Sequence, residues 1–175
     1  MLEGSKVKVR RVQKSDLEKL YSALEELVFS KEGFFYELES YPVFEGLFLQ
    51  NGFFSEDGGL LVVADYKEHL LGVLVFAKNR LYDGYNLKFA IFSEKERSKG
   101  LMSEALGIFS EYFFQSKNIN RLQLLIPNYQ RAALKVAQKC GYKLEGVLKE
   151  ALFFQGRFID LCLYAKLRKE RESYA

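Results

Sequence analysis

Hydrophobic and polar positions recur along the chain with two periods, and these periods predict its first elements. Residues 5–12 (SKVKVRRV) alternate polar and apolar side chains, as a half-exposed strand does. A period near 3.6 follows and predicts a helix, which Ser15 and Glu18 begin as a capping box and which ends near Gly33. Its buried face is expected to carry Leu17, Leu20, Leu24, Leu27 and Val28.

The middle of the chain has the pattern of a β-meander preceded by an aromatic-rich segment. Residues 34–54 are broken by Pro42 and two glycines, and they predict one or two short helices around 36–50. The residues from Tyr66 to His69 are suited to a hairpin turn. Three consecutive strands are expected at 60–65, 70–78 and 85–92.

The second half of the chain alternates helix and strand signals. An apolar stripe from Leu101 to Phe113 predicts a long helix, and Pro127 ends the strand after it. Gly141 suits the position that follows the last turn of another helix. The expected elements after the long helix are a strand at 121–126, a helix at about 130–139, and two strands at 142–153 and 157–167.

The order of these elements predicts the fold class. An antiparallel meander joined to a β-α-β crossover gives an α/β (α+β) fold, with a mixed, mostly antiparallel sheet of about seven strands and helices on both faces. A length of 175 residues favours one domain. We expect residues 1–168 to form it and residues 169–175 to be a charged tail.

Composition narrows the function classes. A net charge of +3 is too small to indicate a nucleic-acid partner, although it is compatible with a small anionic ligand. The first residues lack the apolar run of a secretory signal, and no run approaches a membrane span, so we expect a soluble cytoplasmic protein without a membrane partner. Cys140 and Cys162 have neither the spacing nor the neighbours of metal ligands, which favours buried thiols and no metal.

One charged stretch suggests a binding site. Residues 93–106 (SEKERSKGLMSEAL) lie between a predicted strand and the long helix, with Gly100 at the junction. A helix N-terminus offers backbone N–H groups and a partial positive charge, and Arg97 and Lys99 add full charges. Such a loop suits a pyrophosphate, although charge-rich loops before helices are also common as solvated surface.

Several segments, in this order, resemble the GNAT superfamily of N-acetyltransferases. Within it they are most similar to the Rim-type ribosomal-protein N-terminal acetyltransferases. The segment 97–102 is similar to the family's Arg/Gln-x-x-Gly-x-Gly/Ala loop, except that Met102 occupies its last position. The other matching segments are 103–106 (SEAL), 136–142 (VAQKCGY), 145–148 (EGVL) and 155–160 (QGRFID).

The resemblance implies acetyl-CoA as cosubstrate and assigns residues to it. Backbone N–H groups of the loop would hold the pyrophosphate, and the end of the strand before it would pair with the pantetheine. Gln130 or its neighbour Asn128 would contact the same arm. The residues expected at the cofactor are Ile91, Phe92, Arg97, Ser98, Lys99, Gly100, Leu101, Met102, Ser103, Asn128 and Gln130.

The catalytic groups are less clear than the cofactor loop. Family members attack directly without an acyl-enzyme, and a backbone N–H near Phe92 could stabilise the oxyanion. The Ser and Tyr acids found in different family members are replaced by Ala133 and Ala137. The group that removes the proton from the amine is not assigned: it could be one of four carboxylates, or the proton could leave through water molecules. These carboxylates are Asp83, Asp160, Glu94 and Glu96, of which Asp83 and Asp160 are taken as weak candidates.

The leading hypothesis is an N-acetyltransferase that moves an acetyl group to a primary amine, on a peptide N-terminus or a small molecule. A second hypothesis is a GNAT-fold module that binds CoA without transfer, and a third is a nucleic-acid-binding α+β domain. The lone His69 is expected to be exposed and inert. The Phe pairs at 34–35 and 53–54 flank the expected acceptor wall, and either a monomer or a homodimer is compatible with the sequence.

Overall fold

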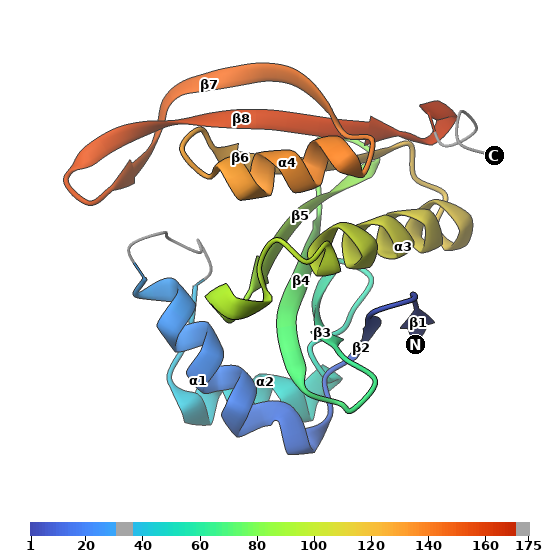
Figure 1. The fold of residues 1–175 in the computed structure, drawn as a ribbon, viewed down its shortest axis with the longest axis vertical. Helices are drawn as coiled ribbons and strands as arrows, with labels where there is room; N and C mark the ends of the chain where they lie inside the picture. Colours follow the sequence, from blue (N-terminus) through green and yellow to red (C-terminus); the bar gives the residue numbers. More distant parts are fainter. Residues whose placement is uncertain (31–36, 171–175) are drawn as a thin grey trace.

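The computed structural model describes residues 1–30 and 37–170. These residues form one sheet of eight strands in the order β1-β2-β3-β4-β5-β6-β8-β7, with helices on both faces (Figure 1). The strands are β1 (Leu2–Glu3), β2 (Lys8–Arg11), β3 (Gly58–Ala64), β4 (Leu70–Lys78), β5 (Gly84–Ile91), β6 (Arg121–Pro127), β7 (Lys143–Phe154) and β8 (Arg157–Leu167). The helices are α1 (Leu17–Val28), α2 (Tyr41–Asn51), α3 (Leu101–Ser116) and α4 (Arg131–Lys139).

The mixed, mostly antiparallel sheet is confirmed, and the structure adds one strand to the seven expected. The addition is β1, whose residues Leu2 and Glu3 pair with Val9 and Lys8. Two residues are too few to leave a hydrophobic period in the sequence. Among the strands of the described residues, only β5 and β6 run parallel, because α3 crosses over between them.

The start of α1 differs from the prediction. A short 3₁₀ turn, Lys14–Asp16, precedes the helix, so Ser15 is not its cap. Asp16 accepts the N–H of Gln13 at 2.8 Å and pairs with Arg10 at 2.7 Å, and both charged groups are buried. A buried carboxylate with an Arg partner stabilises this turn more than an exposed serine hydroxyl would.

Two further predictions about helix ends need correction. The first helix ends at Val28, and the expected end at Gly33 lies outside the described residues. Pro42 does not break the aromatic segment but lies in the first turn of α2, where its missing N–H costs nothing. Gly52 follows the helix in the left-handed conformation, with φ of 64°.

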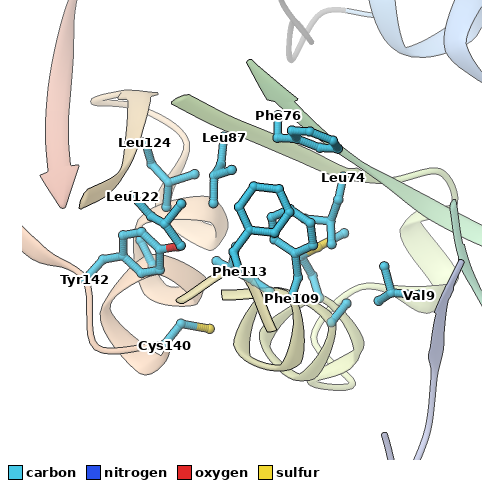
Figure 2. Close-up of a cluster of buried hydrophobic side chains, with 14 of the residues drawn as sticks. Val9, Leu74, Phe76, Leu87, Phe109, Phe113, Leu122, Leu124, Cys140 and Tyr142 are labelled. Carbon is cyan, nitrogen blue, oxygen red and sulfur yellow. The ribbon is translucent and has the colours of Figure 1, made fainter. Parts of the chain in front are cut away.

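Two hydrophobic clusters lie on opposite faces of the sheet. One lies under α1 and α2 and includes Leu20, Leu24 and Phe44. The other lies between the sheet and α3, where the rings of Phe109 and Phe113 pack at an angle beneath that of Phe76 (Figure 2). Fully burying each such ring contributes about 1.5–3 kcal/mol, so α3 is held firmly against the strands that lead to its N-terminus.

The C-terminal end of α3 is closed by a residue from the far end of the chain. Arg168, just after β8, donates to the carbonyl oxygens of Phe114 and Ile119 at 2.7 Å each, and also to that of Lys117. The last carbonyls of a helix lack partners within the helix, so one guanidinium satisfies this turn.

Candidate active site

The sheet divides between β5 and β6. The parallel pairing of these strands ends at Leu87 and Leu124, after which β5 stays with β4 while β6 stays with β8. Figure 1 shows the two halves diverging on the side where α1, the N-terminus of α4 and the start of α3 approach. The result is a split in which strand backbone can face a ligand.

The backbone of Ile91 faces this split. Phe92 donates its N–H to the carbonyl of Leu71 on β4 at 2.9 Å, so Phe92 and Leu71 form a hydrogen-bonded pair of the antiparallel ladder. In an antiparallel ladder the neighbouring pair is of the other kind, so the N–H and C=O of Ile91 point away from β4. The donor expected near Phe92 is therefore the N–H of Ile91, because that of Phe92 is already used.

The loop that follows β5 is shaped for an anion. Ser98 and Gly100 adopt left-handed conformations, with φ of 63° and 80°. The first intrahelical bond of α3 runs from the Glu104 N–H to the Gly100 carbonyl at 3.0 Å. The N–H groups of Leu101, Met102 and Ser103 precede that bond, so helix geometry provides them no partner one turn back. Donors and dipole converge as in known anion-binding loops.

The N-terminal segment anchors this loop. Glu104 accepts the N–H and hydroxyl of Ser5 at 2.5 and 2.6 Å and the N–H of Lys6 at 2.9 Å. Burial alone would raise the pKa of Glu104, but these hydrogen bonds outweigh it and hold the pKa below its ordinary value. Lys6 also donates from Nζ to the Lys99 carbonyl at 3.2 Å.

The side chains of the loop have distinct positions. Met102 is 5% exposed and belongs to the α3 cluster, so the departure from Gly or Ala is accommodated by the core. Lys99 is exposed and pairs with Glu96 at 2.9 Å. Arg97 ends the 3₁₀ turn Glu94–Glu96 and is partly buried. The backbone of the loop, more than its side chains, is arranged for a ligand.

Asn128 and Gln130 lie on the opposite side of the split. They occupy the turn between β6 and α4, and Gln130 donates its N–H to the Pro127 carbonyl at 3.0 Å. Ala133 is partly buried, and Ala137 is fully buried in the α3 cluster. The two sets of predicted cofactor residues thus follow the ends of β5 and β6, the two parallel strands that separate at the split.

The predicted base candidates do not gather there. Asp83 lies just before the first residue of β5, at the end of the strand opposite to Ile91. A strand rises roughly 3.3 Å per residue, so the two residues are about 26 Å apart. Asp160, on β8, accepts the N–H of Glu150 and the ammonium of Lys149 at 2.9 Å each. These bonds hold its pKa below the ordinary value, which weakens it as a base. Asp160 instead supports a bulge of β7 at which Glu150 has φ of 50°.

The thiol of Cys140 lies against the loop, where it donates to the Ser103 carbonyl at 3.1 Å, whereas His69 lies elsewhere. Cys140 is buried after α4, and burial raises the pKa of its thiol to about 11. His69 lies in the β3–β4 turn, where its exposed ring contacts Asp65 at 2.9 Å. Neither forms a Cys–His pair, which fits chemistry without an acyl-enzyme.

The aromatic pairs are core residues where they are described. Phe53 packs against Phe44, with ring centres 4.6 Å apart, and Phe54 packs against Phe76 at 5.4 Å. They join the two clusters on opposite sheet faces instead of forming one wall. The pair at 34–35 lies outside the described residues. Sequence reasoning missed Lys88, which is exposed on β5 just beyond the last paired residue. The one charged residue in the strand Gly84–Ile91 was the available signal.

A split mixed sheet with an anion-binding loop at the start of the following helix is the architecture of acyl-CoA-binding acetyltransferases. A family model described as acetyltransferase (GNAT) domain matches residues 9–163. The chain therefore belongs to the GNAT acetyltransferase family, as the sequence predicted.

Individual proteins match this chain over a shorter segment than the family model does. The chain is 29% identical over 72 residues to an uncharacterized N-acetyltransferase p20 of Bacillus licheniformis, covering 41% of this chain and 40% of that protein. It is 27% identical over 77 residues to the spermidine N(1)-acetyltransferase of Escherichia coli strain K12, covering 42% and 41%. The chain thus matches less than half the length of these curated relatives.

Solved structures share the whole fold. A spermidine N-acetyltransferase from Vibrio cholerae, in complex with CoA and spermine, superposes with a TM-score of 0.80 at 20% identity, covering 95% of this chain and 98% of that one. A dodecameric structure of the Vibrio cholerae enzyme gives 0.80 at 21% identity, covering 96% and 97%. At such identities the likeness concerns the fold.

Proposed function

We propose that this protein is an acetyl-CoA-dependent N-acetyltransferase that acetylates a primary amine by direct attack. One observation carries the proposal: the split between β5 and β6 opens beside the left-handed loop that begins α3. The loop would hold the pyrophosphate through the backbone from Ser98 to Ser103. The pantetheine would extend along Ile91, with Asn128 and Gln130 across the split.

The reaction needs few side chains. The neutral amine attacks the thioester carbonyl carbon, and its oxygen gains negative charge as the tetrahedral intermediate forms. The N–H of Ile91 is directed so that it could donate to this oxyanion. The carbon–sulfur bond then breaks, and CoA leaves as a thiolate that takes up a proton from water. Because Asp83 is remote and Asp160 is already bonded, we favour a water-relayed path for the amine proton.

For the acceptor we propose a polyamine. The segment from Leu17 to Asp57 contains nine acidic residues against two lysines, although the whole chain has a net charge of +3. The helices of this segment pack against Ala90 of β5 and Phe92 just after it, so the acidic region borders the split. A negative surface attracts polycations. The spermidine N-acetyltransferases among its relatives support the same class. A peptide N-terminus, the acceptor of Rim-type enzymes, is the competing choice.

The decisive experiment measures CoA thiol release from acetyl-CoA with spermidine, spermine and an N-terminal ribosomal-protein peptide. Turnover with the polyamines at least tenfold above the peptide is expected. Turnover with the peptide alone would overturn the polyamine assignment while keeping the transferase. No turnover with any amine, together with acetyl-CoA binding in calorimetry, would favour the CoA-binding module that Ala133 and Ala137 suggest. Absence of binding would overturn the entire proposal.

A further inference from the structure

A lysine lies on β5 at the point where the split opens. Lys88 is the one charged residue of this strand. The last parallel pair of β5 with β6 joins Leu87 to Leu124, so Lys88 is the first residue of β5 beyond that pairing. It therefore lies at the apex of the split, where the two halves of the sheet begin to separate.

The side chain of Lys88 points to the face of the sheet that α1 and α2 cover. Successive side chains of a strand alternate between the two faces. Ile91 packs against the α3 cluster, whereas Ala90 packs against the cluster beneath α1 and α2. Lys88 is two residues before Ala90, and its partner on β4, Val75, packs against that same cluster. Lys88 is thus on the same side of the sheet as the acidic segment from Leu17 to Asp57.

The ammonium of Lys88 lies in a recess and not on a convex surface. The side chain is exposed to water, yet burial among the surrounding atoms lowers the pKa of its ammonium. Its neighbours on this face of β4 and β5, Val75 and Ala90, are apolar. Among the described residues, Glu37, shortly before α2, is the charged group that acts on it, and this carboxylate favours the charged form of the lysine. Lys88 is therefore a cation that a ligand in the split can approach.

The direction of β5 relates Lys88 to the reaction. The strand runs from Lys88 past Ile91 to the loop at Ser98–Ser103, so a cosubstrate held by the loop and extended along Ile91 leads toward Lys88. Lys88 and Ile91 are about 10 Å apart, at roughly 3.3 Å per residue. The acidic segment that we propose for the acceptor covers the face to which Lys88 points, so the acceptor would approach the thioester past this ammonium.

We propose that the ammonium of Lys88 drives the reacting amine of the acceptor into its neutral, nucleophilic form by charge repulsion. A nearby like charge disfavours the protonated form of an amine, and the repulsion is stronger in a recess than in bulk water. Lys88 is then a catalytic residue that does the work of a base, a role for which Asp83 is too remote and Asp160 is already bonded. The inference rests on the proposed acetyl transfer to a polyamine and deepens it.

The proton balance of the transfer needs no base on the protein. The protonated amine loses one proton to water beside Lys88, and its nitrogen then forms a bond to the thioester carbonyl carbon. As the carbon–sulfur bond breaks, the nitrogen loses a second proton to water and becomes an amide, and the CoA thiolate takes up one proton. The net reaction converts an ammonium and a thioester into an amide and a thiol, and it releases one proton.

A cation in the split is compatible with a polyamine acceptor. The remote ammonium groups of the polyamine can bind the acidic segment from Leu17 to Asp57, which has nine acidic residues against two lysines. Only the amino group next to Lys88 is disfavoured as an ammonium, and this is the group that must lose its proton. The charges on this face therefore distinguish the reacting end of the acceptor from its binding end.

The test is the pH dependence of spermidine acetylation at saturating acetyl-CoA, where the rise of kcat with pH follows the loss of the proton from the bound amine. Lys88→Met removes the charge and keeps an unbranched side chain. We expect it to move the midpoint of this rise upward by about one pH unit, so that kcat at pH 7 falls about tenfold. Lys88→Arg keeps the charge and should retain the wild-type midpoint. Lys78→Met, at the exposed far end of β4, is the matched control and should leave the profile unchanged.

Calorimetry measures the same effect without turnover. Spermidine is titrated into the full chain saturated with CoA at pH 9, in buffers of different ionisation enthalpy, which gives the number of protons released on binding. Wild-type protein and Lys88→Arg should release more protons than Lys88→Met, because only a cation in the split displaces the proton of the bound amine. The affinity for acetyl-CoA should be the same in all variants, which shows that the fold is kept.

Three results would contradict the proposal, and they are distinguishable. An unchanged midpoint together with an unchanged proton count in Lys88→Met would overturn the role of Lys88 and leave the acetyltransferase intact. A Lys88→Arg variant as slow as Lys88→Met would also overturn it, because Lys88 would then accept the proton itself. Wild-type protein that acetylates no amine would refute the proposed function, and this inference with it.

Discussion

The two ends of the split are built in different ways. At the start of α3 the groups available to a ligand are backbone N–H donors, held by left-handed Ser98 and Gly100 and anchored through Glu104. At the reaction end, the one donor identified is again backbone, at Ile91, and the expected acids are alanines. The comparison teaches that the cosubstrate site we propose is defined by backbone geometry, whereas residues 1–30 and 37–170 show no equally defined set of catalytic side chains.

The largest effect should come from Gly100→Glu. The new side chain must adopt φ of 80° and places a carboxylate where a pyrophosphate would bind. We expect acetyl-CoA affinity to fall at least about 100-fold, or ~2.7 kcal/mol, in calorimetry. Gly107→Glu, on the same helix with no atom within 4 Å of an added Cβ, is the control. Equal losses in both variants would refute the loop assignment.

A smaller effect is expected for Glu104→Gln, which keeps the shape and removes the charge. Charge-assisted hydrogen bonds are worth about 1.5–3 kcal/mol, so affinity should fall roughly tenfold as the loop loosens. The folded-state pKa of Glu104 is lowered, so its stabilisation is complete above pH 4.5 and disappears as pH falls through the folded-state value. Thermal unfolding of both proteins across that range measures it. A stability gap that widened in acid would contradict this account.

At the reaction end, Asp160→Asn separates a base from a structural residue. We expect turnover at pH 7 to change less than about threefold and stability to fall only slightly, because one charge-assisted bond to the bulge weakens and the carboxylate is exposed to solvent. Asp83→Asn, at the remote end of β5, should leave both unchanged. A loss of turnover near 100-fold in Asp160→Asn, with a shifted pH profile, would identify Asp160 as the base.

The smallest effect belongs to Lys99→Ala. Its ammonium is exposed and already paired with Glu96, and such pairs contribute little. Acetyl-CoA affinity should drop about twofold to threefold at low salt, and the difference should shrink at 0.5 M NaCl because salt screens exposed charges. A tenfold or larger loss would mean that side-chain charge, and not backbone geometry, dominates this loop.

Periodic elements were predictable because burial imposes their pattern. The strands at 70–78 and 85–92 and the helix after Gly100 correspond to β4, β5 and α3, and the family prediction is confirmed. The predictions that were wrong or incomplete concern elements that depend on contacts between residues distant in the sequence. Asp16, and not Ser15, stabilises the turn before α1, because Arg10 of β2 binds its carboxylate. The strand β1 forms only through its pairing with β2.

The site was predictable to a similar extent. The sequence predicted the loop residues as one group. It did not predict that the free backbone donor is Ile91 and not Phe92, because this depends on the register of β5 with β4. The commitment of Asp160 to Glu150 depends on a bulge that no periodicity reveals. The assignment to Rim-type enzymes within the family stays a prediction, since local motifs do not define the acceptor.

The contact of Arg168 with the end of α3 affects how the chain can fold during synthesis. Three carbonyls in and just after the last turn of α3 accept from a guanidinium that is synthesised about fifty residues later. A nascent chain that has emerged through α4 possesses the whole phosphate loop but lacks both this latch and the strand β8 that holds β6. The carbonyls at the end of α3 therefore gain this partner last, so we expect the loop before α3, our proposed acetyl-CoA site, to be firmly held only when the C-terminal strand is present.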